Sequence, residues 1–457
     1  MLFSRLPLSE ALLNNLVSLD YLKMTPIQAK SLPAILDNQD VIAKANTGSG
    51  KTAAFALGVL SKIEAENFAP QALIICPTRE LADQVSKEIR RLARVMPNVK
   101  VLTLCGGKPF GMQAESLQMG AHIIVATPGR LLDHIQRKTI WLKQVQTLVL
   151  DEADRMLDMG FYDDIIDIVK ILSPQRQTLL FSATYPDEIA QMSKSIQRNP
   201  MSVSVEAEDK PLITQMAYLV EETTKNECLI NVLSLHSDKS AIVFCRTKAE
   251  CDSVAIMLCQ HDFHALALHG DFEQRDREET LLQFANGSCA ILVATDVAAR
   301  GIDIKDLPLV INFGLPADPD TYVHRIGRTG RAGKEGLALT LFNEKERFKL
   351  DKISSLLDTP ITIHSEAPAY TALRRTPLMR TLCINAGKKN KMRPGDILGA
   401  LTGEGGLAGA SVGKIDIFDF HAYVAIARSQ SAKLINKLQG KIKGRVLKMR
   451  FLDDLPV

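Results

Sequence analysis

The sequence contains no apolar run close to the ~20 residues that a membrane-spanning helix requires, so we expect no membrane segment. Its first 16 residues lack a charged region followed by a continuous apolar core, so we expect no secretory signal. The eight cysteines form no CxxC pair, and most of them lie inside apolar, strand-like runs. This pattern indicates buried free thiols in a reducing cytoplasm.

Disorder and fibrous structure are also excluded, because 46% of the 457 residues are hydrophobic and 23% are charged. The net charge is only +3, but it is unevenly distributed. Residues 380–457 carry 14 basic and 6 acidic residues, whereas residues 1–379 carry 41 basic and 46 acidic residues. A basic C-terminal segment suggests contact with a polyanion, although a solvated domain surface would give the same pattern.

Short apolar runs alternate with helical patterns along the first 360 residues, which favours parallel sheets covered by helices on both faces. The pattern is interrupted near residue 205 and again near residue 364. We therefore predict an α/β protein with two doubly wound domains, at 1–205 and 216–363, and linkers at 206–215 and 364–377. Expected strands begin near residues 41, 72, 99, 122, 147 and 177 in the first domain, and 216, 241, 264, 289, 308 and 336 in the second.

The last segment, residues 378–457, has a different order of elements. Its pattern is strand, helix, strand, strand, helix, strand, with the final strand expected over RVLKMRFL at 445–452. This βαββαβ order is the ferredoxin-like pattern that RNA-recognition domains use.

The segment after the first strand has the pattern of a phosphate-binding loop. Ala45-Asn46-Thr47-Gly48-Ser49-Gly50-Lys51-Thr52 lies between a strand and a helical run. Backbone N–H groups of such a turn surround phosphates, the lysine reaches the β- and γ-phosphate oxygens, and the hydroxyl of Thr52 ligates Mg²⁺. The general pattern begins with Gly, where this sequence has Ala45, and a Gly/Ser loop with a chance lysine is the alternative.

A second candidate element is the acidic pair Asp151-Glu152, which follows the apolar strand TLVL. Ligands of open α/β sheets bind at the carboxyl ends of the strands. Asp151 fits a Mg²⁺ ligand acting through water, and Glu152 fits a residue that orients or deprotonates the attacking water. Adjacent acids after a strand can also be a simple helix N-cap.

With these motifs in order, the chain resembles the DEAD-box ATP-dependent RNA helicases from Phe3 to about residue 340. Asp151-Glu152-Ala153-Asp154 is the signature of that family. The resemblance implies two RecA-like (P-loop NTPase) domains and a Q motif at Tyr21, Thr25 and Gln28 that reads adenine. It also implies catalytic roles for Lys51, Asp151 and Glu152 and for the arginine fingers Arg328 and Arg331, and ATP contacts at Thr47, Gly48, Ser49, Gly50, Lys51, Thr52, Gly301 and Asp303.

The same resemblance implies a set of residues that contact the RNA backbone. In the first domain these are Pro77, Thr78, Arg79, Gly107, Thr127, Gly129 and Arg130; in the second they are Arg246, Thr247, Gln274, Arg277, Thr295, Asp296 and Arg300. Hydroxyls, N–H groups and guanidinium groups in such turns suit phosphate oxygens rather than base edges. Each motif alone is also ordinary loop sequence.

Three further residues are implied to couple the nucleotide to RNA: Ser182, Thr184 and His324, of which His324 can alternatively be a packed structural histidine. The family mechanism is a clamp, in which ATP and RNA together close the two domains and hydrolysis reopens them. Closure should bend one strand and separate a duplex locally.

The last 80 residues resemble the RNA-binding domain of the DbpA-type branch of the family, whose members are bacterial and act on large-subunit ribosomal RNA. RNA-recognition folds commonly stack bases on aromatic residues of the central strands. Here Cys383 and His421 occupy two of those places and only Tyr423 remains, so recognition is expected to use loops and basic residues. The basic candidates are Lys388, Lys389, Lys391, Arg393, Lys441, Lys443 and Arg445, which a solvated face would also explain.

The expected function is therefore local, ATP-dependent unwinding of 23S rRNA during assembly of the 50S subunit, by a cytoplasmic monomer that uses ATP and Mg²⁺. Two alternatives remain open. One is a DEAD-box helicase with another RNA role, such as mRNA turnover or cold adaptation. The other is a non-catalytic RNA-binding protein, against which intact Lys51, Asp151 and Glu152 argue.

Overall fold

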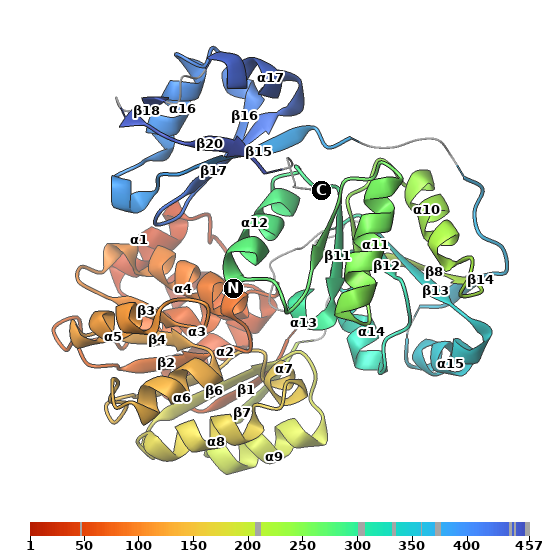
Figure 1. Ribbon diagram of the computed structural model, residues 1–457. Coiled ribbons are helices and arrows are strands. Elements are labelled where there is room, and N and C mark those ends of the chain that lie inside the picture. The colour runs from red at the N-terminus through yellow and green to blue at the C-terminus, as the bar shows by residue number, and fades with distance from the viewer. Residues whose placement is uncertain are drawn as a thin grey trace. The chain divides into compact units, whose positions relative to one another are not determined.

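The computed structural model describes residues 1–45, 48–205, 212–299, 307–330, 335–357, 359–370, 376–437, 441–442 and 445–452. The chain divides into two compact units, formed in the main by residues 1–208 and 209–457 (Figure 1). The second unit contains both the second α/β domain and the small C-terminal domain. Within the described ranges, none of the helices has the length and apolar character needed to cross a membrane.

The first unit contains a parallel sheet in the order β3-β4-β2-β5-β6-β1-β7. Its strands in the described part of the chain are β1 (Val41–Lys44), β2 (Ala72–Ile75), β3 (Val101–Leu104), β4 (Ile123–Ala126), β5 (Thr147–Leu150), β6 (Gln177–Ser182) and β7 (Met201–Ser204). Its helices there are η1 (Phe3–Arg5), α1 (Glu10–Ser18), α2 (Pro26–Leu36), α3 (Lys51–Leu60), α4 (Arg79–Leu92), η2 (Ala93–Val95), α5 (Phe110–Gln118), α6 (Pro128–Gln136), α7 (Ala153–Asp158), α8 (Tyr162–Ile171) and α9 (Asp187–Ile196).

Both faces of this sheet are covered by helices, which explains why its central strands are continuous apolar runs. On one face, alternate strand residues such as Ile74 and Leu179 pack against apolar side chains of α1 to α4. On the other face, residues such as Ile75 and Leu180 pack against α6 to α9. Figure 1 shows these two helical layers on opposite sides of the strands.

The second α/β domain has a parallel sheet in the order β10-β11-β9-β12-β13-β8-β14. The described strands are β8 (Ile213–Leu219), β9 (Ala241–Cys245), β10 (Ala265–Leu268), β11 (Ile291–Thr295), β12 (Leu309–Asn312), β13 (Gly336–Phe342) and β14 (Ile361–His364). The described helices are α10 (Lys225–Leu235), α11 (Lys248–Gln260), α12 (Gln274–Ala285), α13 (Asp296–Ala299), α14 (Pro319–Ile326), η3 (Glu344–Glu346) and α15 (Arg347–Leu356). Strand β8 begins inside the segment expected to be a linker, because Ile213 pairs with Gly336 of β13.

The two α/β sheets have the same strand order if β1 to β7 are replaced in turn by β8 to β14. In each sheet the chain moves outward in opposite directions from two central neighbours, β2 and β5 in one and β9 and β12 in the other. Such a point is where ligands bind in doubly wound folds, at the carboxyl ends of the strands. Corresponding strand ends of the two domains can therefore be compared residue by residue.

The C-terminal domain has an antiparallel sheet in the order β16-β17-β15-β20. Its described elements are β15 (Met379–Ile384), η4 (Lys388–Asn390), α16 (Pro394–Thr402), η5 (Gly409–Ser411), β16 (Val412–Ile417), β17 (Ala422–Ala427), α17 (Arg428–Lys437), β18 (Lys441–Ile442), β19 (Arg445–Val446) and β20 (Met449–Phe451). The predicted βαββαβ order is present, but the single final strand expected at 445–452 is wrong. Its first part pairs with β18 in a separate hairpin, and only β20 joins the sheet.

The cysteines are all free thiols, and seven of the eight are buried, as expected from their apolar surroundings. Cys259 is the exception, because it lies exposed near the end of α11. Burial raises the pKa of Cys105 to about 11 and that of Cys289 to about 12, which keeps both thiols protonated at neutral pH.

Candidate functional site

The phosphate-binding loop lies between β1 and α3, and its two described glycines adopt conformations that other residues rarely adopt. Gly48 has φ 89° and Gly50 has φ 93°. A Cβ atom on Gly50 would lie 2.6 Å from Gln28 Nε2, so the loop also needs a small residue for space. Thr47, predicted to contact ATP, lies outside the described residues.

Lys51 is the first residue of α3 and is only 4% exposed. Its Nζ and the Oγ of Ser49 are buried without a hydrogen-bond partner among the described residues. Buried polar groups without partners are rare in native structures, because leaving them unsatisfied is costly. The site therefore fits a phosphate chain well, because it combines loop N–H groups, a buried ammonium and a helix N-terminus.

Asp151 directly follows β5 and lies beside this loop, with its Oδ1 3.7 Å from Lys51 Nζ. Burial raises the pKa of Asp151 to about 6, although the Lys51 ammonium acts in the opposite direction. The Thr52 hydroxyl side chain, second in α3, and the Asp151 carboxylate are oxygen ligands of the kind that Mg²⁺ prefers. These residues fit a magnesium–nucleotide complex.

Glu152, the neighbour of Asp151, has a left-handed backbone with φ 53°. Its N–H donates a 3.0 Å hydrogen bond to Asp151 Oδ1. Glu152 is buried, with 7% of its surface exposed. A non-glycine residue in this region costs of order 1 kcal/mol, and such strain is concentrated at functional sites. The turn brings Glu152 to the start of α7, next to the carboxylate that the phosphate lysine contacts.

The predicted adenine-reading residues are held against the phosphate-binding loop. Thr25 and Gln28 form a capping box at the start of α2, in which Gln28 Oε1 accepts from the Thr25 N–H at 2.9 Å. Gln28 Nε2 donates to the carbonyl of Gly50 at 3.0 Å. Tyr21 instead donates its hydroxyl to Glu88 of α4 at 2.6 Å; burial and this carboxylate raise the pKa of Tyr21 to about 12.

Asp154 connects the acidic motif to the segment Ser182-Ala183-Thr184 that follows β6. Its Oδ2 accepts hydrogen bonds from the N–H of Ala183 at 3.1 Å and from the N–H and hydroxyl of Thr184, both at 2.9 Å. In return, Ser182 Oγ accepts from the Asp154 N–H at 3.3 Å. The sequence predicts coupling roles for Ser182 and Thr184 but not for Asp154, because a carboxylate three residues after Asp151 carries no signal of its partner.

The RNA-backbone residues predicted for the first domain meet around the loop that follows β3. A Cβ atom on Gly106 would lie 2.9 Å from Arg79 Nη2, and Arg130 Nη1 donates to the Lys108 carbonyl at 2.9 Å. Thr78 caps α4 by accepting from the Leu81 N–H. The remaining predicted residues follow β2, β3 and β4: Pro77, Gly107 (φ 78°), Thr127 and Gly129.

The equivalent strand ends of the second domain are organised by Arg325, a buried residue of α14 that is 2% exposed. Its guanidinium donates to both carboxylate oxygens of Asp296, at 2.7 and 2.8 Å, and to Asn312 Oδ1 and the Gly314 carbonyl. Asp296, predicted to contact RNA, is thus held by an arginine. Sequence reasoning missed Arg325 because burial is not visible in the motif His324 to Arg331.

Other predicted residues of this domain also lie at or near strand ends. Thr247 caps α11 by accepting from the Glu250 N–H at 3.1 Å, as Thr78 caps α4 in the first domain. Gln274 begins α12, Thr295 ends β11, and Arg277 Nη1 lies 3.5 Å from the His269 carbonyl. His324 and Arg328 lie at the end of α14 and just beyond it. Arg300, Gly301, Asp303 and Arg331 lie outside the described residues.

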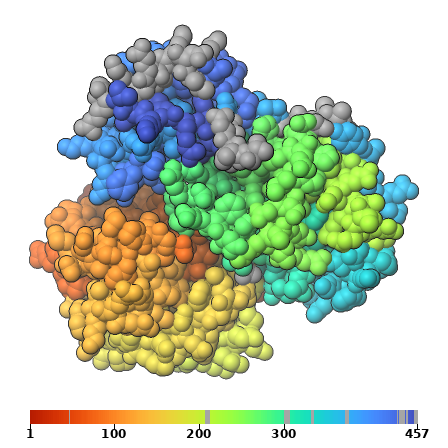
Figure 2. All heavy atoms as spheres, in the orientation of Figure 1, coloured from red at the N-terminus to blue at the C-terminus, as the bar shows by residue number. Residues whose placement is uncertain are grey.

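In the C-terminal domain, which is blue in Figure 2, the face that commonly stacks bases contacts α12 of the same unit. Cys383 and Tyr423 are buried together with Leu282 of α12 and Leu452. Tyr423 donates its hydroxyl to Glu279 at 2.9 Å, and burial followed by this carboxylate raises the pKa of Tyr423.

The predicted basic residues whose side chains are described lie in the segment that follows β15, next to that contact, since the Lys388 N–H donates to the carbonyl of Phe418, which packs against the cluster. Lys388 and Lys389 are in η4, Lys391 has a left-handed backbone, and Arg393 is the N-cap residue of α16; all four are exposed. Lys443 lies outside the described residues, and the side chains of Lys441 and Arg445 do as well.

Comparison with protein families gives three consecutive matches along the chain. Residues 25–192 match the family model "DEAD/DEAH box helicase", residues 224–333 match "Helicase conserved C-terminal domain", and residues 381–451 match "DbpA RNA binding domain". The chain is 53% identical to the ATP-dependent RNA helicase DbpA of Escherichia coli (strain K12), over 97% of this chain and 98% of that protein. This chain belongs to the DEAD-box ATP-dependent RNA helicases of the DbpA type.

Other DEAD-box relatives share the helicase core but less of the chain. The CshA helicase of Geobacillus kaustophilus (strain HTA426) is 45% identical over 77% of this chain and 75% of its own length. The solved structure of S. cerevisiae Dbp5 bound to RNA and ADP BeF3 is 32% identical, covers 80% of this chain and 95% of its own, and has a TM-score of 0.73. The predicted RecA-like fold and the expectation of an RNA-stimulated ATPase are thereby confirmed.

Proposed function

We propose that this DEAD-box helicase unwinds short duplexes of 23S rRNA during assembly of the 50S ribosomal subunit. The match of residues 381–451 to the DbpA RNA binding domain carries the proposal. The helicase core contributes turns that suit phosphate oxygens, which cannot distinguish one RNA sequence from another. Target choice therefore has to reside in the basic C-terminal domain.

The geometry of the phosphate site supports definite roles for its residues. Lys51 donates to the β- and γ-phosphate oxygens, Thr52 and Asp151 hold the metal largely through water, and Glu152 orients the attacking water and receives its proton. When bound, Mg²⁺ neutralises charge that develops on the transferred phosphoryl group. The roles of Arg328 and Arg331 as arginine fingers, and of Gly301 and Asp303 at the ribose, stay predictions.

The C-terminal domain supports recognition through loops and basic residues rather than by stacking on its sheet. Tyr423 is 5% exposed and Cys383 4% exposed, and both pack on α12. The exposed lysines of η4, Lys388 and Lys389, are close in sequence to the α16 N-terminus, where anions are favoured.

We further propose that the protein acts as a cytoplasmic monomer and uses Mg²⁺ with its ATP.

The decisive experiment compares ATP hydrolysis by the full chain with two RNAs. One is a large-subunit rRNA fragment that carries a hairpin near the peptidyl-transferase centre, the target that the resemblance to the DbpA-type branch implies. The other is the same fragment with that hairpin scrambled. Stimulation should require far less of the first RNA. Equal stimulation would leave an ATP-dependent RNA helicase with another RNA target.

A variant pair locates the preference in the C-terminal domain. Lys388→Ala with Lys389→Ala should weaken binding of the hairpin fragment and reduce its salt dependence, by a slope of about 0.7 to 0.9 for each phosphate contact removed. Lys143→Ala, an exposed lysine in the segment between α6 and β5 of the first unit, is the control. A chain that lacks residues from 378 onward should keep weak ATPase stimulation without preference between the two RNAs.

A further inference from the structure

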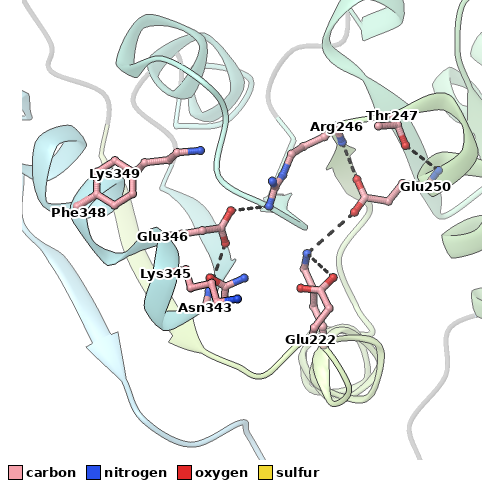
Figure 3. A pocket seen from close by; sticks show the side chains of 10 residues that line it. Glu222, Arg246, Thr247, Glu250, Asn343, Lys345, Glu346, Phe348 and Lys349 are labelled. Carbon is pink, nitrogen blue, oxygen red and sulfur yellow. Dashed lines mark hydrogen bonds and ion pairs between the residues drawn. The ribbon is translucent and has the colours of Figure 1, made fainter.

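A pocket of about 500 Å³ lies in the second α/β domain, apart from every residue assigned above to ATP (Figure 3). Its walls are formed by three segments that follow strands of one sheet. They run from Glu222 to Lys225 after β8, from Arg246 to Glu250 after β9, and from Asn343 to Lys349 after β13. The pocket therefore opens at the carboxyl ends of these strands, beside the switch point between β9 and β12.

The corresponding place in the first domain is the nucleotide site. The pocket strands β8, β9 and β13 correspond to β1, β2 and β6, whose ends carry the phosphate loop, the Pro77-Thr78 turn and Ser182. The lysines also correspond: Lys225 begins α10 as Lys51 begins α3, and both are 4% exposed. The second domain thus keeps a buried ammonium where the first binds phosphate.

The second domain lacks the acid that would make this pocket a hydrolytic site. The residue after β12 is Phe313, where Asp151 follows β5, and Lys225 Nζ lies 4.4 Å from the centre of the Phe313 ring. Glu222 and Glu250 lie 3.7 and 4.0 Å from the same nitrogen, farther than a hydrogen bond. This arrangement supports binding of a phosphate without its hydrolysis.

The opposite wall carries cations that are available to a ligand. Lys345 and Lys349 have no carboxylate partner within the part of the chain that the structure describes, whereas Arg246 pairs with Glu346. Figure 3 shows Arg246 and Glu346 pointing toward each other, with Phe348 and Lys349 side by side on α15. Phe348 is 67% exposed, and Lys349 Nζ lies 6.0 Å from its ring centre.

An exposed aromatic ring flanked by free lysines is the combination that binds single-stranded nucleic acid, because bases stack on the ring and phosphates contact the lysines. The pocket is continuous with the proposed RNA track, since Arg246 and Thr247 line it. We propose that this pocket is an additional RNA subsite, which holds one nucleotide of the single strand beyond the core track. Its phosphate contacts Lys345, Lys349 and Arg246, and its base stacks on Phe348.

Glu346 acts as a competitor of the phosphate in this arrangement. Its Oε1 accepts from the Arg246 guanidinium, and its Oε2 accepts from the Asn343 N–H at 3.2 Å. When RNA binds, Arg246 exchanges the Glu346 carboxylate for the phosphate. Because the ion pair with Glu346 is lost, the new contact adds less to the free energy of RNA binding. Removing the charge of Glu346 while keeping its shape should therefore strengthen RNA binding.

The inference rests on the proposed RNA-binding function, and it is tested by the length dependence of RNA affinity. Fluorescence anisotropy would measure binding of oligouridylates of about six and about twelve nucleotides to the full chain with a non-hydrolysable ATP analogue. In Phe348→Ala with Lys349→Ala, the longer RNA should bind roughly tenfold more weakly, and the shorter RNA about as in the wild type. Lys352→Ala, exposed on the same helix outside the pocket, is the charge-matched control.

The Glu346→Gln variant should bind the longer RNA severalfold more tightly than the wild type does. Oligonucleotides with 4-thiouridine should form photocrosslinks to the peptide that contains Phe348. Unchanged affinity for the longer RNA in both variants, or crosslinks only to other peptides, would overturn the subsite. A loss of pyrophosphate binding in Phe348→Ala/Lys349→Ala, with unchanged RNA affinity, would overturn it in favour of a free-phosphate site.

These outcomes differ from a failure of the proposed function. If the wild-type chain responds to no RNA in ATP hydrolysis, the proposed function fails before any variant is compared. If the wild type responds but the pocket variants bind RNA as it does, only the subsite fails. Thermal melting of each variant ensures that a weaker affinity reflects the pocket rather than unfolding.

Discussion

Thr184 donates its hydroxyl hydrogen bond to Asp154 Oδ2 at 2.9 Å, and so ties the end of β6 to the acidic motif after β5. In Thr184→Val this bond is lost while the two backbone N–H bonds to Asp154 remain. A hydrogen bond to a charged group contributes about 1.5 to 3 kcal/mol, so we expect unwinding to fall roughly tenfold or more.

ATP hydrolysis should fall less than unwinding in Thr184→Val, because no proposed catalytic group is touched. Duplex-displacement and phosphate-release assays on the same preparation measure the two rates. Ser195→Ala serves as control, because it removes a hydroxyl that donates to the Met192 carbonyl of its own helix, α9. Equal loss of both rates would show that the Asp154–Thr184 bond supports catalysis itself rather than coupling.

The phosphate site predicts two variants with different residual binding. Lys51→Ala removes the buried ammonium, so nucleotide binding and hydrolysis should both be lost. Glu152→Gln keeps shape and hydrogen-bonding capacity but loses the basic carboxylate. Hydrolysis should therefore fall by about 100-fold or more while ATP and RNA are still bound. Equilibrium binding of a fluorescent ATP analogue separates the two cases, and sustained turnover by either variant would contradict the assignment.

Nucleotide choice is the third prediction. Gln28 offers a donor and an acceptor, which match the N6/N7 edge of adenine but not the two acceptors of guanine. A mismatched ligand leaves buried groups unsatisfied, so ATP should support hydrolysis and GTP should not. Steady-state kinetics with both nucleotides provide the measurement. Similar kcat/KM values for ATP and GTP would mean that Gln28 does not read the base.

A pH effect on stability is expected from Lys62, whose Nζ donates to the Ile35 carbonyl at 2.9 Å and to Gln177. Burial lowers the pKa of Lys62 to about 8, below its unfolded value of about 10.4. The unfolded chain thus binds more protons between these values, so stability should rise with pH across about 8 to 10.4.

Urea unfolding of the wild type and of Lys62→Met measures this effect. As pH rises through that window, the free energy of unfolding of the wild type should increase by about 1 to 2 kcal/mol relative to that of Lys62→Met. This value is reduced from the full effect because Lys62 is partly exposed to solvent. The exposed Lys143→Met should show no such change. A constant difference between wild type and Lys62→Met would mean that Lys62 keeps its ordinary pKa.

Much of the fold could be predicted from the sequence, because the buried central strands are uninterrupted apolar runs. The edge strands β3 and β10 were expected near residues 99 and 264, but the edge strands β7 and β14 were not. One of the four residues of β7 is buried and none of β14 is fully buried, so neither strand leaves an apolar pattern. The final strand of the C-terminal domain was misjudged because alternation over Arg445 to Leu452 does not reveal that the segment divides between two sheets.

The site was predictable where a residue type and its spacing carry the chemistry, as for Lys51 with Gly48 and Gly50. It was not predictable where the role depends on contacts distant in sequence. Arg325 is recognised only by its burial among Asp296, Asn312 and Gly314, and Asp154 only by its bonds to Thr184. Such roles arise from the strand order, which a local motif does not contain.

The two α/β domains share one strand order, so the choice of ligand does not depend on the arrangement of the strands. Asp151 and Phe313 follow corresponding strands, and the strands of both sheets contribute buried apolar residues to a core. A change at one strand end therefore alters what is bound without endangering the fold. Duplicated domains of this kind can diverge in specificity by exchanging a few terminal residues, which gives a single chain two independent surfaces on which selection can act.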